Sequence, residues 1–278
     1  MIGIFDSGIG GLSVFKEVYK MLPEEHYIYY ADSAHCPYGE KSREYVIGRS
    51  KEITEFLVRE GADIIVVACH TATAAAISVL REGYSDPAKP ETAGHLLEIS
   101  EGRRDHVKFI GMEPAVKPAA GMTRTGVIGV LATAGTLSGT KYRSSRETFT
   151  KGIKVVEHVG NGFVELVEKG ITEGPEAEMT VEKSIRPLLD AGADVIVLGC
   201  THYPFLIGTI RKIAGNDVKI IDPAPAVARH LADVMKEDGL LRTSPGSDYA
   251  SGLKPDIRLF SSGNPRILEE SFNKLIRR

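Results

Sequence analysis

This chain of 278 residues is poor in cysteine and tryptophan and lacks long apolar runs. It has no tryptophan and only three cysteines, Cys36, Cys69 and Cys200. An odd and sparse number of cysteines argues against a disulfide framework and favours a reducing compartment. No apolar run approaches the roughly 20 residues of a membrane-spanning helix, and no basic segment followed by an apolar one marks a signal peptide. We therefore expect a cytoplasmic protein without a role in the membrane.

An excess of positive charge is also missing. The formal net charge is -3 and the isoelectric point is near 6.3. Proteins that bind nucleic acid usually carry a basic surface, so we expect no nucleic-acid partner. The hydrophobic content of 42% and charged content of 26% suit a chain with a buried core and a solvated surface. The length allows one large domain or two of ordinary size.

One stretch of the sequence occurs twice. Gly61–Cys69 and Gly192–Cys200 both begin with Gly-Ala-Asp, continue with apolar residues and end in a cysteine. A short apolar run between turn residues is typical of a buried parallel strand. Polar residues follow each cysteine, at 70–71 and 201–203. Because α/β proteins bind ligands beyond the carboxyl ends of such strands, the repeat predicts one site built from two similar halves, each with a thiol.

Strands and helices alternate along the rest of the chain, which indicates parallel sheets and an α/β fold. Further strands are predicted at 1–5, 27–30, 107–112, 128–131, 154–158, 218–221 and 257–260. Helices are predicted at 12–21, 43–60, 71–81, 142–151, 177–191, 204–214 and 226–237, and a short one begins at 163. The polar segment 84–106 is predicted to be an insertion or a crossover, and 243–256 a loop.

A glycine-rich turn, Asp6–Gly11, lies between the first strand and the first helix. Backbone N–H groups at such a turn suit an anion. A tight connection with no ligand explains the glycines equally well, since the dinucleotide-binding pattern is incomplete. Both interpretations stay open on this turn alone.

Two thiols on opposite faces of a substrate could exchange a proton at a carbon. Cys69 precedes a helix, whose N-terminal N–H groups and dipole are expected to lower the pKa of its thiol. One thiolate would remove a proton from a carbon α to a carboxylate, which is acidic enough, while the opposite thiol returns one, and this inverts the stereochemistry. This chemistry needs no cofactor, because hydrogen bonds and helix N-termini can stabilise the carbanion.

Five motifs closely resemble those of glutamate racemases and follow in the same order from end to end. They lie at 6–14, 37–39, 69–72, 111–115 and 199–204. The resemblance implies interconversion of L- and D-glutamate without cofactor or metal, supplying D-glutamate for peptidoglycan, by a protein that is commonly a homodimer. It also implies two pseudo-symmetric α/β domains with the active site in the cleft between them. The first would comprise residues 1–97 and 209–278, and the second 98–208.

The same resemblance implies a role for individual residues. Cys69 and Cys200 would be the acid/base pair, acting on the D- and the L-enantiomer respectively. Asp6 would assist Cys69, and His202, with Glu168, would assist Cys200. The residues expected to hold the substrate are Asp6, Ser7, Pro37, Tyr38, Gly39, His70, Thr71, Thr201 and His202.

His70 departs from the family pattern, which has asparagine at this position. Asparagine offers a hydrogen-bond donor and an acceptor; a neutral histidine offers both as well, but it is larger and can become charged. This leaves open a racemase of the same superfamily that acts on aspartate or another amino acid.

Two readings from other functional classes also remain. Cys69, His70, Cys200 and His202 are all types of zinc ligand, although neighbours on an extended backbone point apart. A non-catalytic protein that binds a small anion would explain the glycine turns but not the matched cysteines. Cys36 has no matched partner and is expected to take no part.

Overall fold

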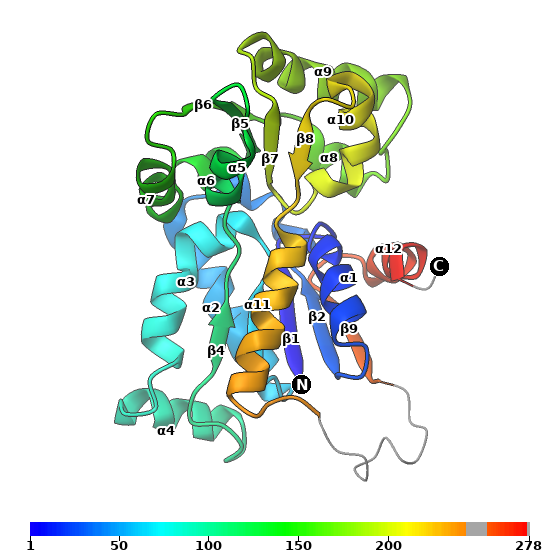
Figure 1. Ribbon diagram of the computed structural model, residues 1–278. Coiled ribbons are helices and arrows are strands. Elements are labelled where there is room, and N and C mark those ends of the chain that lie inside the picture. The colour runs from blue at the N-terminus through cyan, green and yellow to red at the C-terminus, as the bar shows by residue number, and fades with distance from the viewer. Residues whose placement is uncertain (243–254, 277–278) are drawn as a thin grey trace.

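Two parallel β-sheets flanked by helices form the framework of the protein (Figure 1). The computed structural model describes residues 1–242 and 255–276. The first sheet contains β1 (Ile2–Asp6), β2 (Tyr27–Ala31), β3 (Ile64–Val67), β4 (Lys108–Ile110) and β9 (Ile257–Ser261). The second contains β5 (Val127–Ala132), β6 (Lys154–Val159), β7 (Val195–Gly199) and β8 (Lys219–Ile221). Neighbouring strands in the described residues run parallel, which confirms the predicted fold class.

Helices surround each sheet, and the two sheets with their helices form the lower and upper bodies in Figure 1. Around the first sheet lie α1 (Leu12–Met21), α2 (Arg43–Arg59), α3 (His70–Tyr84), α4 (Pro90–Ile99), α11 (Ala224–Glu237) and α12 (Pro265–Ile276). Around the second lie α5 (Val116–Met122), α6 (Ala134–Leu137), α7 (Thr140–Phe149), α8 (Phe163–Glu168), α9 (Pro175–Asp190) and α10 (Ile207–Ala214). Short 3₁₀ helices are η1 (Ser33–His35), η2 (Tyr38–Glu40) and η3 (Tyr203–Leu206). None of the helices described is both long and apolar enough to cross a bilayer.

The two sheets share one strand order. The order β4-β3-β1-β2 of the first sheet corresponds to β8-β7-β5-β6 of the second, and β9 extends only the first. The strands that precede the two cysteines, β3 and β7, therefore occupy equivalent central places. Every residue of both strands is buried. The repeat in the sequence thus corresponds to equivalent strands in two pseudo-symmetric sheets, as predicted.

The aspartate of each Gly-Ala-Asp repeat holds the start of a neighbouring strand. The Asp63 carboxylate pairs with the N-terminal ammonium of Met1, just before β1. The Asp194 carboxylate accepts hydrogen bonds from the Arg124 N–H at 2.7 Å and the Thr125 hydroxyl at 3.0 Å, just before β5. This part of the repeat therefore has a structural role, which is to fix equivalent strands at the ends remote from the cysteines.

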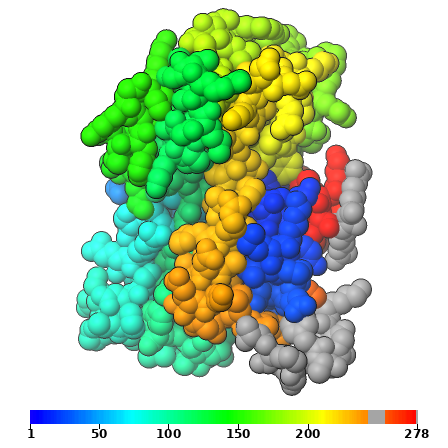
Figure 2. Space-filling model, viewed as in Figure 1, coloured from blue at the N-terminus to red at the C-terminus, as the bar shows by residue number. Residues whose placement is uncertain are grey.

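The predicted domain boundaries place two short strands, β4 and β8, in the wrong sheet. β4 was assigned with residues 98–208, but it pairs with β3 in the first sheet. β8 was assigned with residues 209–278, but it pairs with β7 in the second sheet. The chain therefore crosses between the bodies after β4 and again after β8. It then continues into α11, which packs beside α1 on one face of the lower body (Figure 2).

The segment 84–106, predicted to be an insertion or crossover, contains the helix α4. Pro90 occupies its first turn, where a missing N–H is harmless. Leu96 is buried, and the helix packs against α2 and α3. Most of the predicted loop at 243–256 lies outside the described residues.

Candidate active site

The two repeat cysteines line one pocket at the carboxyl ends of the central strands. Cys69 follows β3 and Cys200 follows β7, so each sheet contributes one thiol. The lining residues are Ser7, Pro37, Tyr38, Gly39, Cys69, His70, Thr71, Thr133, Val164, Cys200, Thr201 and His202. The centre of a water molecule can move through about 10 Å³ of this pocket, which is room for about one water. The pocket is therefore narrow in this structure.

Sequence reasoning identified most of this pocket. Of the nine residues predicted to hold the substrate, all except Asp6 line it. Asp6 and Glu168 lie behind the lining, where each bonds to a lining residue, Thr201 and His202 respectively. The structure therefore brings together the predicted residues from both halves of the chain.

Cys69 caps the N-terminus of α3. Its sulfur accepts a hydrogen bond from the Ala72 N–H at 3.5 Å, and its thiol lies 3.8 Å from the Ser7 hydroxyl oxygen. Burial nevertheless raises the pKa of Cys69 to about 12, and the negative charge of Asp6 adds to the rise. The expectation that the helix N-terminus would lower this pKa was wrong, because one weak hydrogen bond does not offset removal from water. Cys69 is a neutral thiol at pH 7.

Cys200 is connected to a histidine and a carboxylate. Its sulfur lies 3.7 Å from His202 Nδ1, and His202 Nε2 lies 2.7 Å from Glu168 Oε1. Burial acts to lower the pKa of His202, but contacts with Cys200, Cys36 and Glu168 outweigh it and raise this pKa well above its ordinary value. Since both ring nitrogens then carry hydrogens, His202 can donate to the sulfur and to the carboxylate at the same time.

Glu168 is held in place by donors from both bodies. Its Oε1 accepts from the Ile9 N–H at 2.9 Å as well as from His202. Burial acts to raise the pKa of Glu168, but the hydrogen bond and positive charge of His202 outweigh it and lower this pKa. Glu168 and His202 therefore form a partly buried ion pair directly behind Cys200.

Asp6 is fully buried at the end of β1. It accepts hydrogen bonds from the Gly8 N–H at 2.9 Å and the Thr201 hydroxyl at 3.0 Å. Burial raises the pKa of Asp6, although the positive charge of His202 opposes the rise. The carboxylate thus acts on Cys69 through its charge and ties the turn after β1 to the segment after β7.

His70, the departure from the family pattern, lies in the pocket wall and is 2% exposed. Within the described part of the chain, neither of its ring nitrogens has a hydrogen-bond partner. Burial lowers the pKa of His70 to about 3, so the ring is neutral at pH 7. It therefore offers one donor and one acceptor, both unused in this structure.

Thr133 and Val164 are pocket residues that sequence reasoning missed. The Thr133 hydroxyl lies 2.9 Å from that of Thr71, which joins the two bodies across the pocket. A signal for Thr133 was present, because the strand, turn and Leu-Ser at 128–138 resemble those at 2–13. Thr133 follows β5 as Ser7 follows its equivalent strand, β1. Val164 on α8 carried no such signal.

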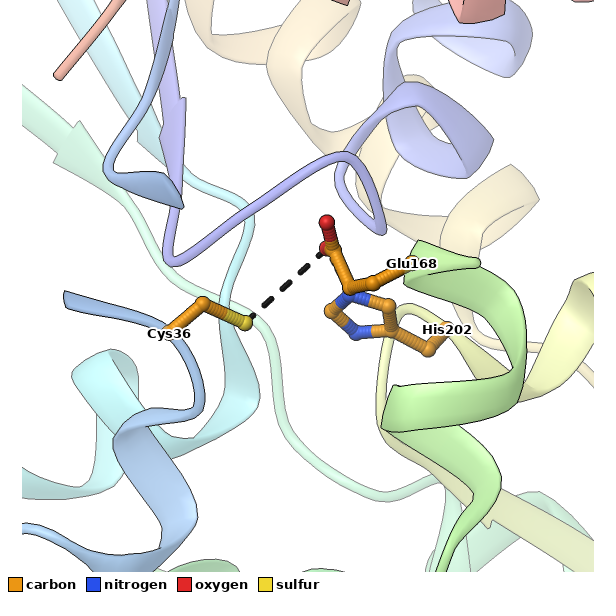
Figure 3. Close-up of side chains that lie close together, drawn as sticks. All are labelled: Cys36, Glu168 and His202. Atoms are coloured by element: carbon orange, nitrogen blue, oxygen red, sulfur yellow. Dashed lines mark hydrogen bonds and ion pairs between the residues drawn. The ribbon is translucent and has the colours of Figure 1, made fainter. Parts of the chain in front are cut away.

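Cys36, expected to take no part, lies against this site. Its sulfur is 3.9 Å from Glu168 Oε1 (Figure 3). Cys36, Glu168 and His202 form a group whose metal-binding atoms all lie within 4.8 Å of one another. In residues 1–242 and 255–276, the four residues considered for zinc from the sequence form no such group.

Comparison with known proteins agrees with this geometry. A glutamate racemase of Roseiflexus is 42% identical over 277 residues, which cover 100% of this chain and 91% of the relative. The chain belongs to the glutamate racemase family. A family model described as Asp/Glu/Hydantoin racemase also matches residues 105–231.

Solved structures of glutamate racemases share the fold of this family member. The enzyme from Bacillus anthracis superimposes with a TM-score of 0.80 at 31% identity, covering 100% of this chain and 94% of that one. The enzyme from Francisella tularensis, solved in complex with D-glutamate, gives 0.76 at 27% identity, covering 100% and 93%. The likeness to glutamate racemases therefore extends over both sheets.

Proposed function

We propose that this member of the glutamate racemase family interconverts L- and D-glutamate by proton transfer at Cα between Cys69 and Cys200, without a cofactor. One observation carries the proposal: the two thiols lie in one pocket, each after the equivalent central strand of its own sheet. A planar carbanion between them would have one thiol on each face, which inversion of Cα requires.

In the L-to-D direction, Cys200 is the base. The His202 imidazolium stabilises the Cys200 thiolate by donating from Nδ1, so the thiolate can remove the Cα proton of L-glutamate. Cys69 then protonates the carbanion from the opposite face. Its high pKa suits a thiol that must hold its proton until the carbanion forms. The reverse reaction starts with the proton on Cys200 and the charge on Cys69.

The remaining lining residues position the substrate. Ser7, Thr71 and Thr201 present hydroxyls to the pocket, and we assign them to the amino and carboxylate groups. The neutral ring of His70 takes the place of the family's asparagine as a donor and acceptor. Tyr38 and Gly39 close the pocket from the first body.

We further propose that the product serves peptidoglycan synthesis in the cytoplasm and that the protein is a homodimer. We divide each chain into two domains where it passes from one sheet to the other, which is between β4 and β5 and again between β8 and α11. This moves the unit boundaries from those predicted from sequence.

Proton exchange in deuterium oxide tests the proposal. The protein is incubated with L-glutamate, and in parallel with L-aspartate, without added cofactor. Circular dichroism follows optical activity and NMR follows loss of the Cα proton. We expect exchange and racemisation of glutamate. Exchange on aspartate alone would mean that His70 has redefined the pocket, and exchange on neither would refute the racemase assignment for both substrates.

Single serine variants test the assignment of the two thiols. Cys69→Ser and Cys200→Ser are each expected to lower racemisation by roughly 10²–10⁴-fold in both directions, the usual loss for a general acid or base. Cys36→Ser is the matched control, because this cysteine does not line the pocket. Equal loss in all three variants would count against a two-thiol reaction.

A further inference from the structure

Cys36, Glu168 and His202 converge from three separate segments of the chain (Figure 3). Cys36 follows η1, Glu168 ends α8 and His202 follows β7. Glu168 Oε1 lies 3.9 Å from Cys36 Sγ and 2.7 Å from His202 Nε2. A thiol, an imidazole and a carboxylate are the three side-chain types that bind Zn²⁺. The proposed racemisation uses two of these side chains but gives no reason for the third.

The spacing of the three atoms suits one small cation. Zinc lies about 2.3 Å from sulfur and about 2.0–2.2 Å from nitrogen and oxygen, so tetrahedral ligands stand roughly 3.3–3.6 Å apart. The two distances above bracket this range, and all three atoms lie within 4.8 Å of one another. Small side-chain rotations are therefore enough to surround an ion, with no change in the backbone.

Glycine at position 8 allows Cys36 and Glu168 to lie where they do, and solvent reaches both side chains. A Cβ at position 8 would come within 2.1 Å of Glu168 Oε1 and 3.2 Å of Cys36 Sγ. The Glu168 side chain is 23% exposed, and Cys36 is partly exposed. An ion can thus arrive from solvent and keep a water as its fourth ligand.

We propose that Cys36, Glu168 and His202 form an inhibitory site for a thiophilic divalent cation such as Zn²⁺. The consequence for catalysis rests on the function proposed above. Binding releases two protons, one from the Cys36 thiol and one from Nε2 of the His202 imidazolium. Metal–sulfur, metal–nitrogen and metal–oxygen bonds form in their place, and the ion pair between His202 and Glu168 is lost.

An ion on Nε2 disables Cys200 without touching it. The two nitrogens of an imidazole point away from each other, and Nδ1 is the one that faces the Cys200 sulfur at 3.7 Å. In the reaction proposed above, Cys200 gains a proton when it acts on L-glutamate and has to lose it again before the next molecule. With Nε2 occupied by the ion, Nδ1 keeps its hydrogen, so the ring cannot accept that proton from Cys200 and pass it on through Nε2. We therefore expect kcat to fall in both directions while the pocket itself stays free.

Cobalt substitution tests the site independently of activity. Co²⁺ is titrated into the metal-free protein under a reductant that does not bind metals, and thiolate-to-cobalt charge-transfer absorption is followed. We expect one equivalent to give the band in the unmodified protein, in Cys69→Ser and in Cys200→Ser. Cys36→Ser is expected to lose it, because serine can keep the hydrogen bond to Glu168 but is a poor zinc ligand.

Inhibition is measured next with Zn²⁺ in a metal buffer. The rate is expected to fall at least about tenfold and to recover with chelator, and Cys36→Ser is expected to need at least about tenfold more zinc. A band that survives in Cys36→Ser but disappears in Cys200→Ser would put the ion on the reacting thiols and overturn the proposal. So would the absence of any band. A Cys36-dependent band in a protein that exchanges no glutamate would leave the metal site standing and refute the racemase function.

Discussion

Thr201 donates its hydroxyl hydrogen to the Asp6 carboxylate at 3.0 Å, which connects the segment after β7 to the turn after β1. Both residues are buried, and Asp6 ends a strand of the first sheet whereas Thr201 follows a strand of the second. The hydrogen bond therefore ties the two bodies together at the bottom of the pocket. It also satisfies one oxygen of a carboxylate that burial makes difficult to ionise.

Removing this hydroxyl is expected to destabilise the protein. Thr201→Val leaves a buried oxygen of Asp6 without its donor, which lowers the free energy of unfolding by about 1–3 kcal/mol. Thr201→Ser keeps the donor and is the control. Urea unfolding of both variants measures the difference. Equal stability of the valine and serine variants would show that the bond contributes nothing.

The ion pair between Glu168 and His202 predicts a change in the pH profile. The pKa of His202 is raised in the folded protein, so the imidazolium persists below this pKa and is lost as the pH rises through it. Glu168→Gln removes the negative partner, which helps to raise this pKa, and therefore lowers it. The alkaline limb of kcat/KM for L-glutamate should move to lower pH as a result. An unchanged limb in Glu168→Gln, with Glu165→Gln as control, would contradict this coupling.

We expect His70 to lower the stability of the protein while it supports substrate binding. Both of its ring nitrogens are buried without partners in the described structure, so His70→Leu should raise the free energy of unfolding by about 1 kcal/mol. The same variant loses the donor and acceptor, so its KM for glutamate should rise about tenfold. His70→Asn restores the family residue and should keep the low KM. Urea unfolding and steady-state kinetics separate the effects, and an unchanged KM in the leucine variant would mean that His70 does not contact the substrate.

The lowered pKa of Asp194 leads us to expect that its contribution to stability changes at acid pH. Burial acts to raise its pKa, but the donors of Thr123, Arg124 and Thr125 outweigh this and lower the pKa to about 2. The resulting stabilisation is present above the unfolded pKa of about 3.9 and is lost as the pH falls through about 2. Asp194→Asn should therefore lower the free energy of unfolding by about 2 kcal/mol at pH 7.

Thermal unfolding from pH 7 down to pH 2.5 checks the Asp194 prediction. The difference between Asp194→Asn and the unmodified protein should shrink below about pH 4. Asp217 is exposed, so Asp217→Asn is the control and should change the stability little at any pH. A difference that stays constant with pH would show that the carboxylate charge is not responsible.

Local patterns were enough to predict the central strands and a site at the two cysteines, and the resemblance to glutamate racemases supplied most of the other pocket residues. The apolar runs before Cys69 and Cys200 have no alternative to burial, and the motif residues after them come to the same edge because all the strands are parallel. Sheet membership of β4 and β8 was not predictable in this way. Each has three residues, and their places depend on pairing with strands far away in the sequence.

The state of the thiols was also beyond local reasoning. The helix after Cys69 argued for a lowered pKa, but burial and the charge of Asp6 decide the outcome. Likewise Cys36 had no matched cysteine, and its contact with Glu168 joins positions 132 residues apart. Such effects depend on three-dimensional neighbours that no sequence pattern encodes.

The two thiols have different surroundings, although the sheets that carry them share one strand order. Cys200 lies beside the His202 ring, whereas Cys69 contacts the Ala72 N–H and the Ser7 hydroxyl and lies near the Asp6 carboxylate. The repeat in the fold therefore gives the two thiols equivalent positions in their sheets but different neighbours for a proton. In the reaction proposed above, each turnover would carry one proton from one side of the pocket to the other, so that proton would have to return before the same enantiomer could react again.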